Sequence, residues 1–373
     1  MKWLILIVIV VLGVDGSTSA FQQDDDVLTP TPLLTRTVGF NEISWSSQDN
    51  VIAVVPPQLE TATQGQQIAQ TTGDVELWQP FSSRGDLEYA SALWLPDALV
   101  QTNEQTGQQR RFPTLFEFSP DGERLAMDVG ELIMADVRTG EVLYTQPEID
   151  GIYWNPDGTR LVSQDLNETA FTIVIWDANT GTELQRYRSP NRLPEGARPY
   201  AAILDFSWGT EEEIAFIAND DTRGILNLAT GTVTDIYDCC IEEAFYLKWQ
   251  PGGRLLATHD RVYDVDLRQP LFYFPHQSDV YWSPDGQWLI GDTGTVVSLI
   301  SIADQRVMLR FSLDAIAAQY GDYVTNLVWS PDGQYIATIT GIDDENGRRQ
   351  HYVTIWDIQA IIAEAGYTLS IIP

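Results

Sequence analysis

The stretch VYWSPDGQWL, residues 280–289, joins an apolar segment that ends in an aromatic residue, a tight turn and a second apolar segment. Near-copies recur along the chain: FEFSPDGERL from Phe116, IYWNPDGTRL from Ile152, LKWQPGGRLL from Leu247 and LVWSPDGQYI from Leu327. Pro fixes φ at the first central position of the turn, Asp can bond to its own backbone, and Gly adopts the positive φ that a tight hairpin needs. The stretch therefore predicts a β-hairpin that occurs several times.

The aromatic residue before the turn aligns seven units, which begin around Trp45, Phe118, Trp154, Trp208, Trp249, Trp282 and Trp329. After a first interval of 73 residues, the intervals are 33 to 54 residues, which brackets the length of a four-stranded repeat. Several units continue with a third apolar segment and a second turn, as in TIVIWD from Thr172 and NTGTE from Asn179. One such sheet cannot bury both faces alone, so the units must stack, and radial stacking gives a β-propeller.

We therefore predict an all-β fold, a β-propeller of four-stranded blades, with seven blades favoured and eight as the alternative. The segment SALWLPDALVQT from Ser91 has the look of a further unit. However, Trp94 precedes Phe118 by only 24 residues, too few for four strands, and this favours an elaborated connection after the first blade. Ring closure has two candidates, because Leu33 to Val38 and Tyr367 to Ile372 could each supply a strand of the last blade.

The repeated WSPDG, followed by an apolar strand and by IWD with TG, resembles the WD-repeat propellers and the related TolB-like propellers of bacterial exported proteins. The resemblance covers about residues 40–370 and rests on repetition. The Gly-His pair that opens many WD repeats is absent, and the Trp-Asp pair occurs only at Trp176-Asp177 and Trp356-Asp357. These departures favour the bacterial, TolB-like type.

The N-terminal residues predict export and define three parts of the chain. Residues 1–20 contain one Lys, an apolar run and small residues that end at Ala20, which is typical of a cleaved signal peptide, with a retained anchor as the alternative. Residues 21–32 are acidic and contain Pro, so we expect a flexible lead-in. Residues 33–373 would form one propeller domain, with no membrane span after the N-terminal segment and an extracellular, cell-surface or periplasmic location.

The charge balance excludes one class of partner. The chain has 53 acidic and 21 basic residues and a formal net charge of −32, so most of its surface would repel a phosphate backbone and nucleic acid is not an expected partner. The two cysteines, Cys239 and Cys240, are adjacent. They predict either two small apolar residues packed under a loop or a vicinal disulfide, an intermolecular bridge being the third reading.

The strand order predicts which face of the ring is available for binding. The WSPDG and TG turns would open onto one face, and the long, uneven connections onto the other, where binding residues are usually found. Many residues of these connections are acidic, so we predict a protein partner, one with a cationic patch being favoured. The alternative is that the acidic loops only maintain solubility. The residues chosen for this site are Asp220, Asp221, Glu242, Glu243, Asp343, Asp344 and Glu345.

Catalytic motifs do not stand out in the sequence. There is no G-x-S-x-G, the three histidines are scattered, and His259 is expected at the end of a blade strand. The spacing of Asp343, Asp344 and Glu345 differs from that of an EF-hand loop, and neither a metal site nor a cofactor is predicted. The leading prediction is a non-enzymatic binding or assembly scaffold. The alternative is a propeller enzyme of the glycoside hydrolase or lyase type, with carboxylates in the central channel.

Overall fold

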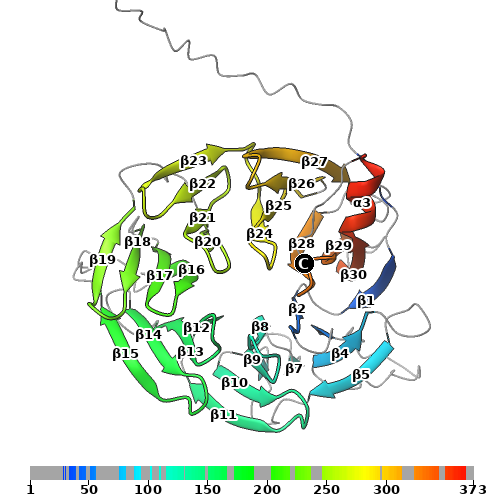
Figure 1. Ribbon diagram of the computed structural model, residues 1–373. Coiled ribbons are helices and arrows are strands. Elements are labelled where there is room, and N and C mark those ends of the chain that lie inside the picture. Colours follow the sequence, from blue (N-terminus) through cyan, green and yellow to red (C-terminus); the bar gives the residue numbers. More distant parts are fainter. Residues whose placement is uncertain are drawn as a thin grey trace, which may run out of the picture.

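The computed structural model describes residues 28, 30, 33–38, 42–47, 51–55, 75–80, 88–93, 101–102, 109–110, 115–129, 131–147, 150–165, 172–188, 203–218, 223–236, 246–294, 296–312, 323–343 and 349–366. These residues form seven four-stranded antiparallel sheets and one two-stranded sheet. Figure 1 shows the seven sheets arranged radially around a central axis, which is the arrangement of a seven-bladed β-propeller. The predicted fold class is confirmed, with seven blades.

The strands of each blade follow one another from the axis to the rim, and an eighth sheet pairs two short strands (Figure 1). The first blade consists of β2 (Ile43–Trp45), β3 (Ile52–Val54), β4 (Val75–Gln79) and β5 (Glu88–Leu93), and the second of β8 (Leu115–Phe118), β9 (Arg124–Asp128), β10 (Glu131–Asp136) and β11 (Val142–Pro147). The third consists of β12 (Asp150–Trp154), β13 (Arg160–Gln164), β14 (Thr172–Asp177) and β15 (Glu183–Arg188), the fourth of β16 (Ile203–Thr210), β17 (Glu213–Ala218), β18 (Arg223–Asn227) and β19 (Thr232–Asp235), and the fifth of β20 (Lys248–Trp249), β21 (Leu255–Ala257), β22 (Arg261–Asp264) and β23 (Gln269–Tyr273). The sixth consists of β24 (Asp279–Trp282), β25 (Trp288–Asp292), β26 (Val296–Ser301) and β27 (Arg306–Ser312), the seventh of β28 (Tyr323–Trp329), β29 (Tyr335–Asp343), β30 (Arg349–Asp357) and β1 (Leu34–Val38), and the extra pair of β6 (Gln101–Thr102) and β7 (Gln109–Arg110).

The ring is closed by the N-terminal strand. β1 pairs antiparallel with β30, from Leu34 opposite Ile355 to Val38 opposite His351, and so completes the seventh blade. One of the two candidates for closure is thus confirmed, while Tyr367 to Ile372 lies outside the described residues. The connection after the first blade contains the β6–β7 pair, in agreement with an elaborated connection rather than an eighth blade.

Part of the predicted lead-in also contacts the ring. Leu28 forms a parallel bridge with Phe311 on the outer strand of the sixth blade, donating to the carbonyl of Arg310 at 3.2 Å. Its own carbonyl accepts from Ser312 N at 2.6 Å. The predicted signal peptide, residues 1–20, lies outside the described residues and stays a prediction.

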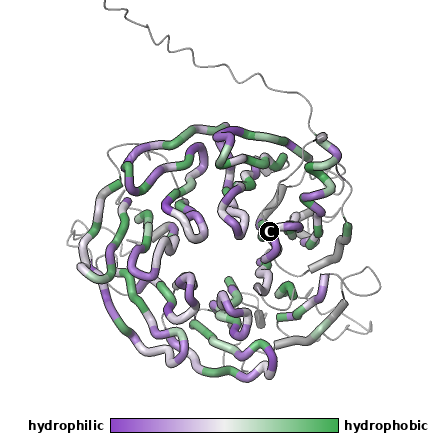
Figure 2. The backbone as a smooth tube through the Cα atoms, in the orientation of Figure 1, coloured by the Kyte–Doolittle hydropathy of each residue, from purple (hydrophilic) through white to green (hydrophobic). Residues whose placement is uncertain are grey.

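The apolar core is divided among the interfaces between blades. Figure 2 shows apolar and polar stretches alternating within the blades, without one central apolar mass. In the interface between the first two blades, Leu77 packs in one cluster with Phe116 and Leu125. Clusters of the same kind lie at the other blade interfaces. Each blade is therefore stabilised by both neighbours, as a stacked repeat requires.

One helix, α3 (Ile358–Glu364), follows the last strand and covers the interface between the sixth and seventh blades. Asp357 caps its N-terminus, since the carboxylate accepts from Ala360 N at 2.8 Å. Ile358, Ile361 and Ile362 are buried in the cluster that also includes Leu28. No helix in the described part of the chain is long and apolar enough to cross a bilayer.

Candidate functional site

The hairpin turn of the repeated stretch is held by its own side chains. In the second blade, Ser119 Oγ donates to Asp121 Oδ1 at 2.5 Å and accepts from Arg124 N at 3.0 Å. Asp121 Oδ1 also accepts from Glu123 N at 3.1 Å, and Gly122 has a φ of 70°. The same bonds are formed in the sixth and seventh blades by Ser283 with Asp285 and by Ser330 with Asp332. The turn residues thus determine hairpin geometry.

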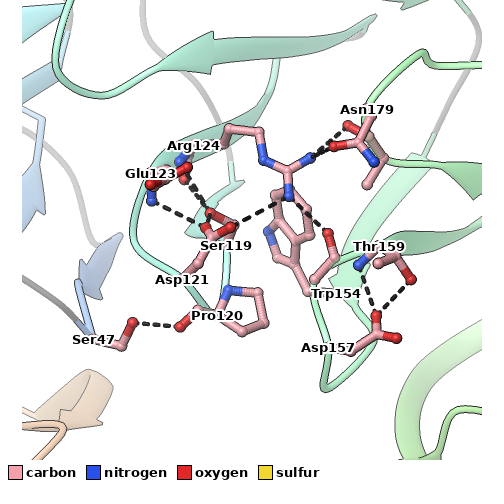
Figure 3. Close-up of polar contacts among 12 residues, drawn as sticks. Ser47, Ser119, Pro120, Asp121, Glu123, Arg124, Trp154, Asp157, Thr159 and Asn179 are labelled. Carbon is pink, nitrogen blue, oxygen red and sulfur yellow. Dashed lines mark hydrogen bonds and ion pairs between the residues drawn. The ribbon is translucent and has the colours of Figure 1, made fainter.

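Arg124, which follows this turn, reaches into the next blade (Figure 3). Its Nη1 donates to Ala178 O at 2.9 Å and to Asn179 Oδ1 at 3.0 Å, while Nη2 donates to Gly158 O at 2.7 Å. The guanidinium carbon lies 5.0 Å from the centre of the Trp154 ring, within range of a cation–π interaction. One planar side chain therefore joins two turns of the third blade to the second.

We call the side of the ring that carries these turns the short-turn face and the opposite side the long-loop face. On the short-turn face, Ser47 Oγ of the first blade donates to Pro120 O of the second at 2.5 Å (Figure 3). Together, this bond and the hydrogen bonds of Arg124 show that turn atoms in the first three blades form contacts between neighbouring blades. These turns are accordingly part of the architecture.

The aligned tryptophans also bond between blades. Their indole Nε1 atoms donate to the backbone carbonyl one residue before the aligned aromatic of the preceding blade. The pairs are Trp154 with Glu117 at 3.2 Å, Trp208 with Tyr153 at 3.0 Å, Trp282 with Lys248 at 2.8 Å and Trp329 with Tyr281 at 3.2 Å. This explains why an aromatic with an N–H recurs at the position, and it gives these rings a structural role.

The fifth blade departs from this pattern. Trp249 Nε1 donates to Gly253 O, within its own turn, at 3.1 Å. Its ring lies against Gly209 of the fourth blade, where an added Cβ would meet ring atoms at 2.2 to 2.4 Å. Gly209 occupies the position that is Ser in the WSPDG turns, and here only a residue without a side chain leaves room for the neighbouring ring.

Side chains near the axis pair with the inner edge of the next blade. The first strand of a blade has no neighbour in its own sheet on the axial side, so some of its N–H groups need other acceptors. Ser44 Oγ accepts from Phe118 N at 3.1 Å, and Ser207 Oγ accepts from Trp249 N at 2.7 Å. Asp205 Oδ2 accepts from Leu247 N at 2.9 Å. We call the positions one and three residues before each aligned aromatic the hub positions.

Lys248 is the single cation at the hub positions of the seven aligned units. Its Nζ lies 3.2 Å from Asp205 Oδ2, and the two side chains are 31% and 7% exposed. Burial favours a lower pKa for Lys248, but the carboxylates of Asp205 and Asp279 outweigh it and raise the pKa. For Asp205, burial raises the pKa despite the opposing charge of Lys248. The amine therefore stays protonated, which prevents it from acting as a nucleophile.

Three further acids have pKa values raised by burial. Burial raises the pKa of Glu42 from 4.5 to about 8, although Asn326 Nδ2 donates to its Oε1 at 3.2 Å. Burial likewise raises the pKa of Glu117 to about 7, opposed by a hydrogen bond from the backbone of Trp154. Asp292 reaches about 6 for the same reason. Carboxyls with such values are suited to proton transfer near neutral pH, so Glu42 and Glu117, which interact electrostatically, are the candidate residues of the enzyme alternative.

The structure places the sequence-predicted binding residues only in part. Asp343 ends β29, in register with Arg349, at the connection to β30 on the long-loop face. The other residues chosen for the binding site or as a disulfide lie outside the described residues: Asp220, Asp221, Glu242, Glu243, Asp344, Glu345, Cys239 and Cys240. The acidic binding surface and the vicinal disulfide therefore stay predictions.

His259 lies two residues after β21 ends and is 7% exposed. Its ring centre is 4.7 Å from that of His276, on the connection to the sixth blade. Within the described ranges, no three His, Cys, Asp or Glu side chains are grouped so that they could hold a metal ion.

Sequence reasoning missed the hub residues Glu42, Glu117, Asp205 and Lys248. Counting back one and three residues from the aligned aromatics would have found them, because side chains alternate along a strand. Lys248 carried a second signal. The chain contains only two lysines, and the other is Lys2 in the predicted signal peptide.

The comparisons with known proteins bear on the fold alone. No family model matches the sequence, and no curated protein matches it. A chain in the crystal structure of the mitotic checkpoint complex is similar in structure, with a TM-score of 0.58 and 16% sequence identity over 91% of this chain and 98% of that chain. The fold is a WD40-like β-propeller. Because 988 chains of solved structures match, the likeness indicates a widely used fold rather than a particular function.

Proposed function

We propose that this protein is an exported, non-enzymatic propeller of the bacterial TolB-like type that binds a protein partner through its long-loop face. One observation carries the proposal: turn atoms of the short-turn face and side chains at the hub positions are used in bonds between blades. Arg124 joins two blades on that face, and Asp205 accepts hydrogen bonds from both Leu247 N and the ammonium of Lys248. These groups hold the ring in shape, and binding residues are usually found on long connections such as those of the opposite face.

The partner's chemistry follows from charge. With a net charge of −32, the protein would favour a partner that presents a cationic patch and would repel anionic surfaces. One structural neighbour of this fold belongs to a protein complex, which is compatible with a scaffold role. A location outside the cytoplasm, whether extracellular, on the cell surface or periplasmic, follows from the predicted signal peptide.

The test is affinity purification of the tagged mature chain from the envelope fraction, followed by mass spectrometry. Asp343→Asn, Asp344→Asn and Glu345→Gln together should release the partner. A matched control removes three charges from the short-turn face, at Glu123, Glu141 and Glu211, each changed to Gln; all three are exposed. Equal recovery of the partner by both triple variants would refute the acidic long-loop site.

Export has a separate test that uses the lysine content. Removal of residues 1–20 takes away Lys2 and leaves Lys248 as the one lysine of the mature chain. A lysine-specific protease should then cut the denatured mature protein once. Recovery of a protein that still carries residues 1–20 from the exported fraction would favour the retained anchor.

The second candidate is an enzyme, and the pKa values favour it. The carboxyls of Glu42 and Glu117 have pKa values of about 8 and about 7, in the range of a general acid at neutral pH. Hydrolysis of a panel of glycosides, esters and peptides by the purified protein, abolished by Glu117→Gln, would support this candidate. The same result would refute the non-enzymatic scaffold.

A further inference from the structure

Three buried polar atoms lie in one row across the sixth blade. Gln277 Oε1, Ser298 Oγ and Arg310 Nε are all buried and have no hydrogen-bond partner within the described part of the chain. Ser298 stands in register with Gly291 on one side and with Arg310 on the other. Gln277 and Ser298 are both 0% exposed. Buried groups of this kind normally have a partner, so three together require a physical reason.

The amide of Gln277 covers the place where Gly291 has no side chain. A Cβ at Gly291 would lie 2.5 Å from Gln277 Cγ and 2.7 Å from Gln277 Oε1. Side chains directly opposite on one face of a sheet have Cβ atoms about 4.5–5.5 Å apart. Because Gln277 Oε1 occupies the Gly291 position, it lies next to the Ser298 side chain, within reach of a single bridging molecule.

The orientation of this amide is fixed by its other end. Gln277 Nε2 donates to Pro275 O at 2.5 Å, and the backbone N–H of Gln277 donates to His259 O at 2.7 Å. A carbonyl can only accept, so the nitrogen must face Pro275 and the oxygen must face the row. The row therefore offers an acceptor at Gln277, a hydroxyl at Ser298 and a charged donor at Arg310.

This combination selects the chemistry of the ligand. An anion would be repelled by the amide oxygen, a metal cation would be repelled by the guanidinium, and an apolar molecule would leave all three atoms unpaired. Water can donate to Gln277 Oε1 and accept from Arg310 Nε, and it can do either with Ser298 Oγ.

We propose that a buried water molecule binds between the fifth and sixth blades, bridging Gln277 Oε1 and Ser298 Oγ with Arg310 Nε as its third partner. Gln277 belongs to the connection that links the two blades, and Ser298 to the third strand of the sixth. The water joins this connection to the sheet beneath it. Gly291 is required because any side chain there would displace the amide that forms one wall of the site.

The first test is the stability of Ser298→Ala. If the hydroxyl bonds to water, its removal leaves that water one partner short, and the unfolding equilibrium constant should rise about fivefold, corresponding to about 1 kcal/mol. Ser207→Ala, which removes a hydroxyl that accepts from Trp249 N at 2.7 Å, is the reference for a bonded serine. A buried hydroxyl without a partner is a cost to the fold, so an unchanged or lower unfolding constant for Ser298→Ala overturns the proposal.

The second test is a high-resolution crystal structure of the unaltered protein. We expect a density peak within about 2.7–3.2 Å of both Gln277 Oε1 and Ser298 Oγ. The peak should be absent or displaced in the crystal structure of Gly291→Ala, where Gln277 must move. A direct hydrogen bond between Gln277 and Ser298 in the unaltered protein, with no peak between them, would overturn the proposal.

Discussion

Replacing Lys248 with Met removes the ammonium from the axis and keeps an unbranched apolar stem of similar length. The change removes the ammonium from Asp205, which is 5% exposed, while the backbone N–H of Leu247 still donates to its Oδ2 at 2.9 Å. It also removes the positive charge that lowers the pKa of Glu117 and that attracts the carboxylate of Asp279. We expect Lys248→Met to destabilise the ring more than the loss of any surface ion pair.

The magnitude follows from the burial of the pair. Removing one partner of a fully buried ion pair costs about 3–5 kcal/mol. Lys248 retains 31% exposure of its side chain, so we expect about 2–3 kcal/mol at pH 8 after allowing for solvent screening. At pH 5 the cost should be smaller, because the carboxyl of Asp205, whose pKa is already raised by burial, can then bind a proton once the ammonium is gone.

The assay is urea denaturation at pH 8 and pH 5, followed by tryptophan fluorescence. Arg160→Met is the matched control, since Arg160 Nη1 lies 3.6 Å from Glu212 with side chains 32% and 48% exposed. Such an exposed pair should contribute less than about 1 kcal/mol. If Lys248→Met cost no more than the control, or the same at both pH values, the assignment of Lys248 as the charge that stabilises the hub would be refuted.

Three further predictions concern the turns and the hub. Gly209→Ser restores the residue of the WSPDG turns, yet it should destabilise the protein by about 1–3 kcal/mol in urea denaturation, because its Cβ would lie 2.2 to 2.4 Å from Trp249 ring atoms; a neutral effect would show that this ring moves aside freely. Gln305→Gly should raise the melting temperature, since Gln305 has a φ of 55°, where a residue with a Cβ is disfavoured by about 1 kcal/mol; a lower melting temperature would contradict the strain. The free energy of unfolding should fall as the pH rises from about 4.5 to about 8. Glu42 and Glu117, with pKa values raised to about 8 and about 7, keep their protons in the folded state over this range, whereas the unfolded chain releases them. The double variant Glu42→Gln, Glu117→Gln should flatten this part of the profile.

The fold could be read from the sequence because its strongest signals are local. A turn such as Ser283 to Gly286 forms from residues within five positions of one another, and the aromatic before it recurs at a fixed place. Blade number followed from counting these units. The strand that closes the ring was harder to choose, since β1 and its partner β30 are separated by most of the chain.

The hub could not be read in the same way. The role of Asp205 depends on which residue of the next blade faces it, and Leu247 and Lys248 are more than forty positions away in sequence. Burial raises the pKa of Glu42, and the hydrogen bond that opposes this shift comes from Asn326, near the other end of the chain. Such contacts exist only once the ring has closed, and no local pattern encodes them.

The two kinds of cation in this chain serve different geometries. On the short-turn face, Arg124 uses a planar guanidinium to bind oxygens of Gly158, Ala178 and Asn179 that lie in fixed directions. At the hub, the acids that act on Lys248 come from different blades, with Asp205 before it in the ring and Asp279 after it. A compact ammonium with three rotatable donors suits charges spread around it better than a rigid fork does. In a chain with a net charge of −32, one lysine at the axis offsets repulsion where carboxyls from several blades converge, and its loss should therefore be felt by the whole ring.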